Sequence, residues 1–356
     1  MSKTVHERPG IYSSYDASAA VIGGTAAKTV GVAAKALKGA VGEPVVMTGY
    51  AACAAVFGED QTDSPGMSTL VKLLFKNGAT SVVGVRVDDA GGTADYQAAF
   101  DVLALAEEVR IVLCDSASLT VQQAMRDMVQ SASENRRERM AVTGGSGETA
   151  AQLVTRAAGL NSERVVLVGP DALDSDGNSL PAVFAAAALA GAIASNADPA
   201  VPLNGLPLYG LGGLSTAYGD NDIDLLVRGG VTPLESAAGV ISPVRGITTR
   251  TSTGGSADTT WRELTTILIV DHVIPAIRTT LRSKFTRTKN TAQNRSAVRS
   301  QIIVELEKNV AAQIIDSYGE VTVTALPDDP TVCVAEFGFA VAHGLNQIYL
   351  TAHITV

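Results

Sequence analysis

The residues whose types and spacing could best support chemistry form one glycine-rich turn, at residues 143–150 (TGGSGETA). The turn follows a predicted strand, opens a predicted helix and contains Gly145-x-Gly147-x-x-Ala150, a relaxed form of the dinucleotide-binding fingerprint. Asp171 follows the next predicted strand, where a ribose-binding acid would stand. If the turn were a phosphate loop, Glu148 would replace its lysine and repel phosphate. The pattern therefore favours a turn ending in a helix cap, as in many α/β domains that bind nothing.

Other potential metal ligands and nucleophiles are scattered along the chain. The histidines form no HxxxH or HExxH pair and the cysteines no CxxC pair, so neither set predicts a zinc site or a disulfide framework. Residues 174–178 (DSDGN) resemble a calcium loop but lack its downstream glutamate. We therefore expect no metal, no cofactor and no catalytic residue, and a chain that is not an enzyme. The scattered residues are His6, His272, His343, His353, Cys53, Cys114 and Cys333.

Charge is segregated along the chain. The net charge is −9, yet residues 245–300 hold ten basic and three acidic residues, which leaves −16 on the rest. Such polarity indicates that one face meets an acidic partner. Solvated helix surface and an acidic protein partner are the leading interpretations. Nucleic acid is a weaker one, because Phe285 is the sole aromatic residue among the basic ones from 278 to 299.

The glycine-rich turn lies within a predicted α/β domain, residues 23–242. Apolar strand-like segments alternate with helical patterns of 11 to 15 residues, which is typical of βαβ units and a mostly parallel sheet. An Ala-rich helix, a loop, and a turn with a short helix complete the domain. The predicted strands are 80–87, 110–114, 139–143 and 164–169; the helices are 94–106, 120–134, 148–158 and 180–195; the loop is 199–213 and the last turn 228–242.

A C-terminal α+β domain, residues 243–342, has a different pattern. Residues 258–285 predict a helix kinked at Pro275, and residues 297–317 predict a second helix with apolar side chains every four positions. Strand-like segments follow at 320–325 and 331–341, so we expect two helices and an antiparallel sheet.

Both termini predict extended arms. Residues 1–22 contain Pro9-Gly10 and no amphipathic helical period, and residues 343–356 end in a strand that alternates to the last residue. A strand that reaches the terminus must find a partner edge in its own sheet or in a neighbour's.

Composition favours association and argues against a membrane span. Hydrophobic residues make up 46% and charged residues 18%, so much of the surface is expected to be covered by like subunits. The first ten residues contain no apolar stretch, and the apolar residues 182–194 are too few to cross a bilayer. We expect a chain made in the cytoplasm without membrane integration.

Several segments, in this order, resemble the contractile tail sheath family of myophages, R-type bacteriocins and related injection machines. The C-terminal resemblance covers about a third of the chain, and residues 23–242 resemble only a general α/β insertion. The segments are Glu7-Arg8-Pro9-Gly10-Ile11-Tyr12, residues 242–251 (SPVRGITTRT), Trp261-Arg262-Glu263-Leu264, Lys289-Asn290-Thr291, Asn294-Arg295, and Glu336-Phe337-Gly338 onward to Val356.

The resemblance implies a homopolymer that wraps helically around a tail tube and contracts to drive it through a target envelope. It implies a C-terminal domain beside the tube, an outward α/β domain, and arms that pair with neighbours' strands. Tube, baseplate and tail terminator proteins would be partners, in a virion tail or tail-like particle assembled in the host bacterial cytoplasm. The implied strand-exchange residues are Ile11, Tyr12, Tyr15, Ile348, Tyr349, Leu350, Thr351, His353 and Ile354, and the tube-facing ones Arg282, Lys284, Arg287 and Lys289.

Two rival interpretations remain. One is a nucleotide-dependent α/β enzyme that uses Gly145 and Gly147. The other is a different self-assembling shell or tube protein.

Overall fold

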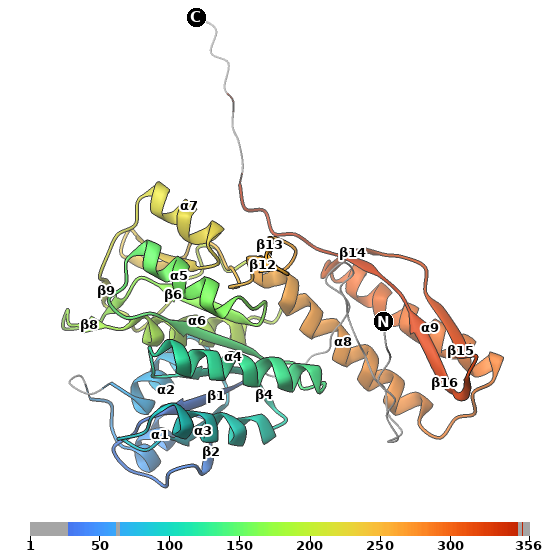
Figure 1. The fold of residues 1–356 in the computed structure, drawn as a ribbon, viewed down its shortest axis with the longest axis horizontal. Helices are drawn as coiled ribbons and strands as arrows, with labels where there is room; N and C mark the ends of the chain where they lie inside the picture. Colours follow the sequence, from blue (N-terminus) through green and yellow to red (C-terminus); the bar gives the residue numbers. More distant parts are fainter. Residues whose placement is uncertain (1–27, 62–64, 348–350, 352–356) are drawn as a thin grey trace, which may run out of the picture.

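A computed structural model describes residues 28–61, 65–347 and 351 of the chain. It has an α/β domain and a smaller C-terminal domain, joined by the long helix α8 (Figure 1). The fold class predicted from the sequence, α/β followed by α+β, is confirmed.

The α/β domain is built on one eight-stranded sheet of order β11-β10-β6-β5-β4-β1-β3-β2. Its inner pairs are parallel, and the edge strands β2 and β11 are antiparallel to their neighbours. Successive residues of β1, β3 and β4 enter the cores on opposite faces, which is why these strands read as unbroken apolar stretches. The strands are β1 (Thr29–Ala34), β2 (Pro44–Met47), β3 (Val82–Arg86), β4 (Val109–Cys114), β5 (Met140–Gly144), β6 (Val165–Gly169), β10 (Thr232–Ala237) and β11 (Val240–Pro243).

Helices cover both faces of this sheet. One face packs against α1 (Tyr50–Phe57), α2 (Met67–Lys76) and α6 (Ala182–Ser195), and the other against α3 (Thr93–Leu105) and α4 (Leu119–Glu134).

The alanine-rich α6 packs closely, as its small side chains predict. A Cβ on Gly191 would lie 2.6 Å from the carbonyl oxygen of Leu74 in α2. Two more helices, α5 (Ala150–Leu160) and α7 (Asp220–Arg228), share a small core beside β6. The short strands β7 (Ala172–Leu173), β8 (Ser179–Leu180) and β9 (Gly213–Leu214) form a separate sheet.

Helix α8 (Leu264–Phe285) belongs to two cores at once. Leu264 and Ile267 pack into the main α/β core, whereas Val273 and Ile277 pack into the C-terminal core with α9 (Ala292–Ala311). Within the described residues, α8 alone is long and apolar enough to cross a membrane by length and composition, and 56% of that stretch is buried inside the protein. A core helix shared by two domains accounts for its apolar character.

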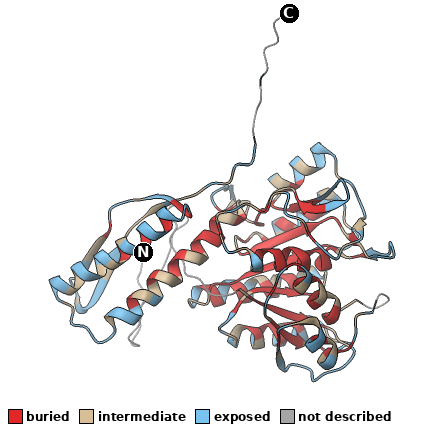
Figure 2. Ribbon diagram, turned by 180° about the vertical axis from the view of Figure 1, so that it is seen from behind, coloured by how far each residue is buried: buried red, intermediate tan, exposed pale blue. Residues whose placement is uncertain are grey.

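The C-terminal domain places its strands in two separate ladders. β14 (Ile315–Tyr318) pairs with β17 (Phe339–Val341), and β15 (Thr322–Leu326) pairs with β16 (Asp329–Glu336). Both ladders are antiparallel and two-stranded. Figure 2 shows this domain far more exposed than the α/β interior.

Several local predictions were wrong. Helix α8 starts at Leu264, after the hairpin of β12 (Ser252–Thr253) and β13 (Ser256–Ala257), and not at residue 258, and α9 ends at Ala311, before β14, and not at residue 317. The predicted turn and short helix at 228–242 is the β10–β11 hairpin. The sequence did not predict a strand there because Pro233 stands inside β10, and proline argues against a strand; β10 pairs with β6 over only two residues. β1 was not recognised. The predicted strand 331–341 breaks at Phe337-Gly338 into β16 and β17. Helix α9 starts earlier than predicted because the Thr291 hydroxyl accepts a hydrogen bond from the Asn294 N–H.

Candidate assembly surfaces

Side chains from within the glycine-rich turn and from the segments next to it fill the space above its backbone. The Gly147 N–H donates to Asp171 Oδ2 at 2.6 Å, so the protein's own carboxylate occupies the place of a phosphate. Glu148 pairs with Arg156 at 2.8 Å, and a Cβ on Gly145 would lie 2.0 Å from Glu148 Oε2. The turn leads into α5, whose N-cap threonine accepts a hydrogen bond from the third residue of the helix, as the predicted helix cap requires.

The other candidate ligand residues form no metal-binding group in the part of the chain that the structure describes. There, no group of three histidine, cysteine or acidic side chains is placed to hold a metal ion. Asp174 accepts hydrogen bonds from the N–H groups of Asp176 and Asn178, so the calcium-like segment is a hydrogen-bonded turn. The surfaces that remain as candidates are those that could contact other protein chains.

Two ion pairs join α8 to the α/β domain. Arg164, whose side chain is 1% exposed, donates to both carboxylate oxygens of Asp271 at 2.8 and 3.1 Å. About two turns further along α8, Arg278 donates to Glu138 at 2.7 Å. Burial raises the pKa of the Asp271 carboxyl, and the Arg164 guanidinium opposes that rise. These contacts set the position of α8 on the sheet.

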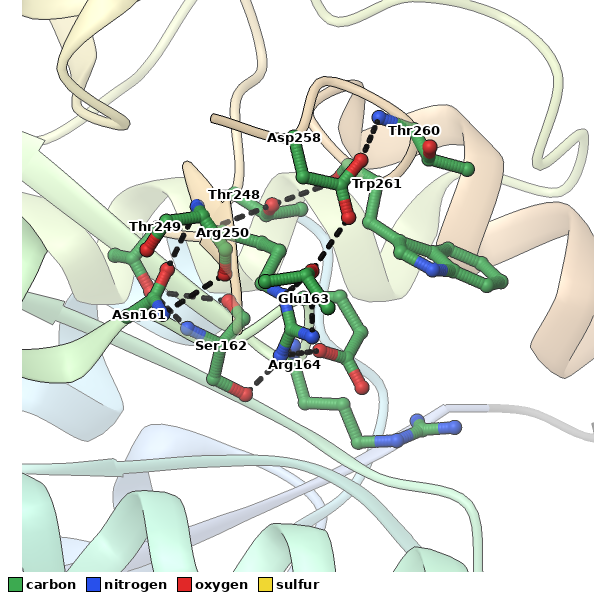
Figure 3. Close-up of polar contacts among 12 residues, drawn as sticks. Asn161, Ser162, Glu163, Arg164, Thr248, Thr249, Arg250, Asp258, Thr260 and Trp261 are labelled. Atoms are coloured by element: carbon green, nitrogen blue, oxygen red, sulfur yellow. Dashed lines mark hydrogen bonds and ion pairs between the residues drawn. The ribbon is translucent and has the colours of Figure 1, made fainter. Parts of the chain in front are cut away.

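The segment from Thr248 to Trp261 packs on the loop before β6 (Figure 3). Asn161 Oδ1 accepts from the N–H groups of Thr251 and Ser252 at 3.1 and 3.2 Å. Residues 242–251 and 261–264, which carry the family resemblance, therefore serve as the junction between the two domains. Further contacts are Ser162 N–H to Thr249 Oγ1 at 3.0 Å, Arg250 to Glu163 at 3.3 Å and Thr248 Oγ1 to the Trp261 carbonyl at 2.6 Å.

Asp258 stabilises the loop between the two segments of this junction. Its carboxylate accepts from the Thr253 hydroxyl at 2.5 Å and from the Thr260 N–H at 2.9 Å. The Thr253 hydrogen bond, followed by the one from Thr260, lowers the pKa of Asp258 to about 2. The short hairpin β12 (Ser252–Thr253) with β13 (Ser256–Ala257) is held in this way.

The predicted tube-facing residues gather at one end of the C-terminal domain. Arg282 and Lys284 lie in the last turns of α8, and Arg287 and Lys289 lie in the loop before α9; all four are exposed. None of them forms an ion pair with an acid among the described residues. They form a cationic surface, which we call the basic end.

The β14–β17 ladder has open outer edges. Between its two strands, backbone hydrogen bonds extend from Ala342 N–H to the Ile314 carbonyl at one end and from Gly319 N–H to the Gly338 carbonyl at the other. No described residue outside the ladder covers either edge with a backbone hydrogen bond. A groove beside it is lined by Val310, Gln313, Ile315, Asp316, Ala342 and His343. One face of the ladder packs into the C-terminal core with α9, while its edges keep free backbone groups, so the ladder can accept further strands.

The described residues that adjoin the two predicted arms contact the α/β domain. Lys28 Nζ donates to the carbonyls of Ile193 and Asn196 at the end of α6, at 3.0 and 2.9 Å. At the other end, Asn204 Nδ2 donates to Asn346 Oδ1 at 2.8 Å. Thr351 is exposed. The other predicted strand-exchange residues, Ile11, Tyr12, Tyr15, Ile348, Tyr349, Leu350, His353 and Ile354, lie outside the described residues.

Sequence reasoning missed the open ladder and the buried ion pairs. A visible signal for the ladder was the Phe337-Gly338 step, which interrupts an otherwise continuous strand pattern. No local signal marks Arg164 and Asp271 as partners, because they are 107 residues apart.

Comparisons with known proteins agree on one family. Residues 89–249 match the phage tail sheath protein central domain, and residues 256–355 match the phage tail sheath C-terminal domain. The tail sheath protein of Bacillus phage SP01 is 32% identical over 253 residues, 69% of this chain and 43% of that protein. The chain thus spans less than half the length of this curated relative.

Solved structures share the fold over nearly the whole chain. The anti-feeding prophage helical sheath in its contracted state has a TM-score of 0.71 and 16% identity, covering 98% of this chain and 99% of that one. The sheath tail protein of Desulfitobacterium hafniense has a TM-score of 0.69 and 12% identity, covering 94% and 100%. Both domain matches, the relative and the shared fold lead to one conclusion: the chain belongs to the phage tail sheath family.

Proposed function

We propose that this chain is the structural subunit of a contractile sheath, which polymerises helically around a tail tube and contracts to drive that tube through a target envelope. Beyond family membership, the observation that carries the proposal is the β14–β17 ladder with its open edges. Such a ladder can accept added strands, and we infer that the two terminal segments are the strands the chain donates.

Strand donation links subunits strongly while each body stays free to swing. Backbone hydrogen bonds hold the donated strand, and the connecting arm absorbs the change in angle. Since donor and acceptor are different surfaces, the contact repeats as an open helical array. The body would move between an extended array and a shorter, wider one, with a kinetic barrier holding the extended form until a baseplate signal.

The basic end is our candidate for the grip on the tube. Four exposed cations without acidic partners among the described residues suit a weak, salt-screened contact with an acidic surface. With this grip, the C-terminal domain would lie at the inner radius and the α/β domain outside. Baseplate and tail terminator proteins would bind the two ends of the polymer, in a phage tail or tail-like particle assembled in the bacterial cytoplasm.

Neutralising the basic end should loosen the tube without preventing sheath polymerisation. For the variant Arg282→Gln, Lys284→Gln, Arg287→Gln, Lys289→Gln we expect co-sedimentation with tubes to weaken roughly tenfold. Four exposed charges at about 0.3–0.4 kcal/mol each contribute about 1.4 kcal/mol together, which is a factor of about ten in affinity. The control Arg282→Lys, Arg287→Lys keeps the charge and should bind like the wild type. An unchanged tube-bound fraction for the neutralised variant would reject the role.

Negative-stain electron microscopy of the purified protein tests the proposal as a whole. We expect long tubules. Closed shells would favour a different self-assembling particle protein. Small discrete particles that bind nucleotide would favour the α/β enzyme, against which the closed glycine-rich turn already argues.

A further inference from the structure

The C-terminal domain offers a second ladder that could compete for incoming strands. β16 has eight residues, most of them exposed, and among the described residues it pairs only with β15. Its sequence, DPTVCVAE, is rich in β-branched residues. A long, exposed edge of this kind pairs with other chains unless something protects it.

One asparagine side chain covers the outer edge of β16. Asn290 Nδ2 donates to the Pro330 carbonyl at 2.8 Å and to the Val332 carbonyl at 3.1 Å. Pro330 has no N–H to offer an added strand. Two acceptors of this edge are therefore occupied, and one donor position is missing.

The asparagine is held in this orientation by a neighbour. Arg295 Nη1 donates to Asn290 Oδ1 at 3.0 Å, which identifies that atom as the acceptor and turns Nδ2 toward β16. The loop around it is also fixed, since Asn294 Nδ2 donates to the Lys289 carbonyl at 2.7 Å. The β14–β17 ladder has no comparable side-chain cover among the described residues.

We propose that Asn290, oriented by Arg295, closes the outer edge of β16 to strands from other copies of this chain, so that donated arms add to the β14–β17 ladder alone. The proposal rests on the proposed function for the identity of the incoming strands. Asn290 would thus determine which of two ladders links the subunits. An open β16 edge would allow off-register links and irregular polymers.

Hydrogen–deuterium exchange on the full chain, before and after polymerisation, tests the edge directly. The Val332 and Val334 N–H groups report on it, because Val332 N–H points to the same side as its carbonyl and Val334, two residues further on, points to that side as well. In the wild type we expect no added protection there on polymerisation. In Asn290→Ala we expect their exchange to slow by about tenfold or more, with irregular aggregates by electron microscopy.

Two further variants separate the loss of the Asn290 amide donor from a general effect of mutation in this region. Asn290→Asp retains the shape but loses the amide donor and should behave like Asn290→Ala. Ser296→Ala removes an exposed hydroxyl that donates to the Ala292 carbonyl within α9, away from Asn290, and should behave like the wild type. Thermal unfolding of each monomer shows that the domain is intact.

Protection of Val332 and Val334 in wild-type polymers would overturn the inference, and so would unchanged exchange in both Asn290 variants. If the proposed function is wrong, the result is different: residues 315–318 and 339–341, which form the β14–β17 ladder, gain no protection from exchange, whether or not the protein polymerises. The variant result at β16 still decides the inference then, since β16 edges of two copies can pair without the arms.

Discussion

Sheaths are expected to be absent when residues 351–356 are deleted. Each subunit would lose most of its C-terminal strand, and with it the backbone hydrogen bonds to a neighbour's ladder. If about five such bonds form, at roughly 1 kcal/mol net each, the link weakens by roughly 5 kcal/mol, or some thousandfold in affinity. A helical polymer repeats that loss at every subunit, so long tubules should disappear from electron micrographs.

The truncation should leave the subunit itself folded. The contact between Asn204 and Asn346 lies before the deleted residues and is retained. Thermal unfolding of the monomer should therefore match the wild type. A side-chain control, Thr351→Ser with Thr355→Ser, keeps the strand and should polymerise normally, because β-augmentation depends mainly on backbone bonds. Normal sheaths from the truncated chain would sink the strand-donation hypothesis.

Replacing Asp271 by alanine should cost about 3–5 kcal/mol of unfolding free energy, because it leaves the Arg164 guanidinium buried without its carboxylate. Arg164 keeps its hydrogen bond to the Arg139 carbonyl at 3.0 Å, which does not neutralise the charge. Chemical denaturation of dilute subunits measures the loss.

Two controls separate burial from charge. The exposed pair Arg228–Asp224 lies on α7, and Arg228→Ala should cost less than about 1 kcal/mol. The double variant Arg164→Met, Asp271→Leu removes both charges and should recover much of the lost stability, as replacements of buried pairs by apolar residues often do. A loss below about 1 kcal/mol for Asp271→Ala would show that the pair does not hold α8.

This ion pair bears on function because α8 belongs to both cores. Any displacement of a C-terminal domain by a neighbour's strand is passed to the α/β domain through α8, Arg164–Asp271 and Arg278–Glu138. Loosening α8 should therefore make sheaths that assemble but vary in subunit orientation.

The sequence by itself determined the class of each domain. Apolar stretches of strand length, separated by helical periods, specify a parallel sheet covered on both faces because that pattern is local and repeats. It also determined the cationic stretch near residues 282–289 and the unsuitability of Glu148 for phosphate, since these depend on residue type and order alone; the extended arms stay a prediction.

The tertiary structure alone decided how distant segments meet. In the folded chain, Asp171 accepts a hydrogen bond from the glycine-rich turn and Arg164 pairs with Asp271. One predicted strand is divided into β16 and β17, and Asn290 lies against the edge of β16. Hydrogen bonds and ion pairs between such segments depend on where the packed chain brings them, and no local periodicity encodes that. For the same reason, the β14–β17 ladder became a candidate acceptor of strands only once its open edges were visible in the structure.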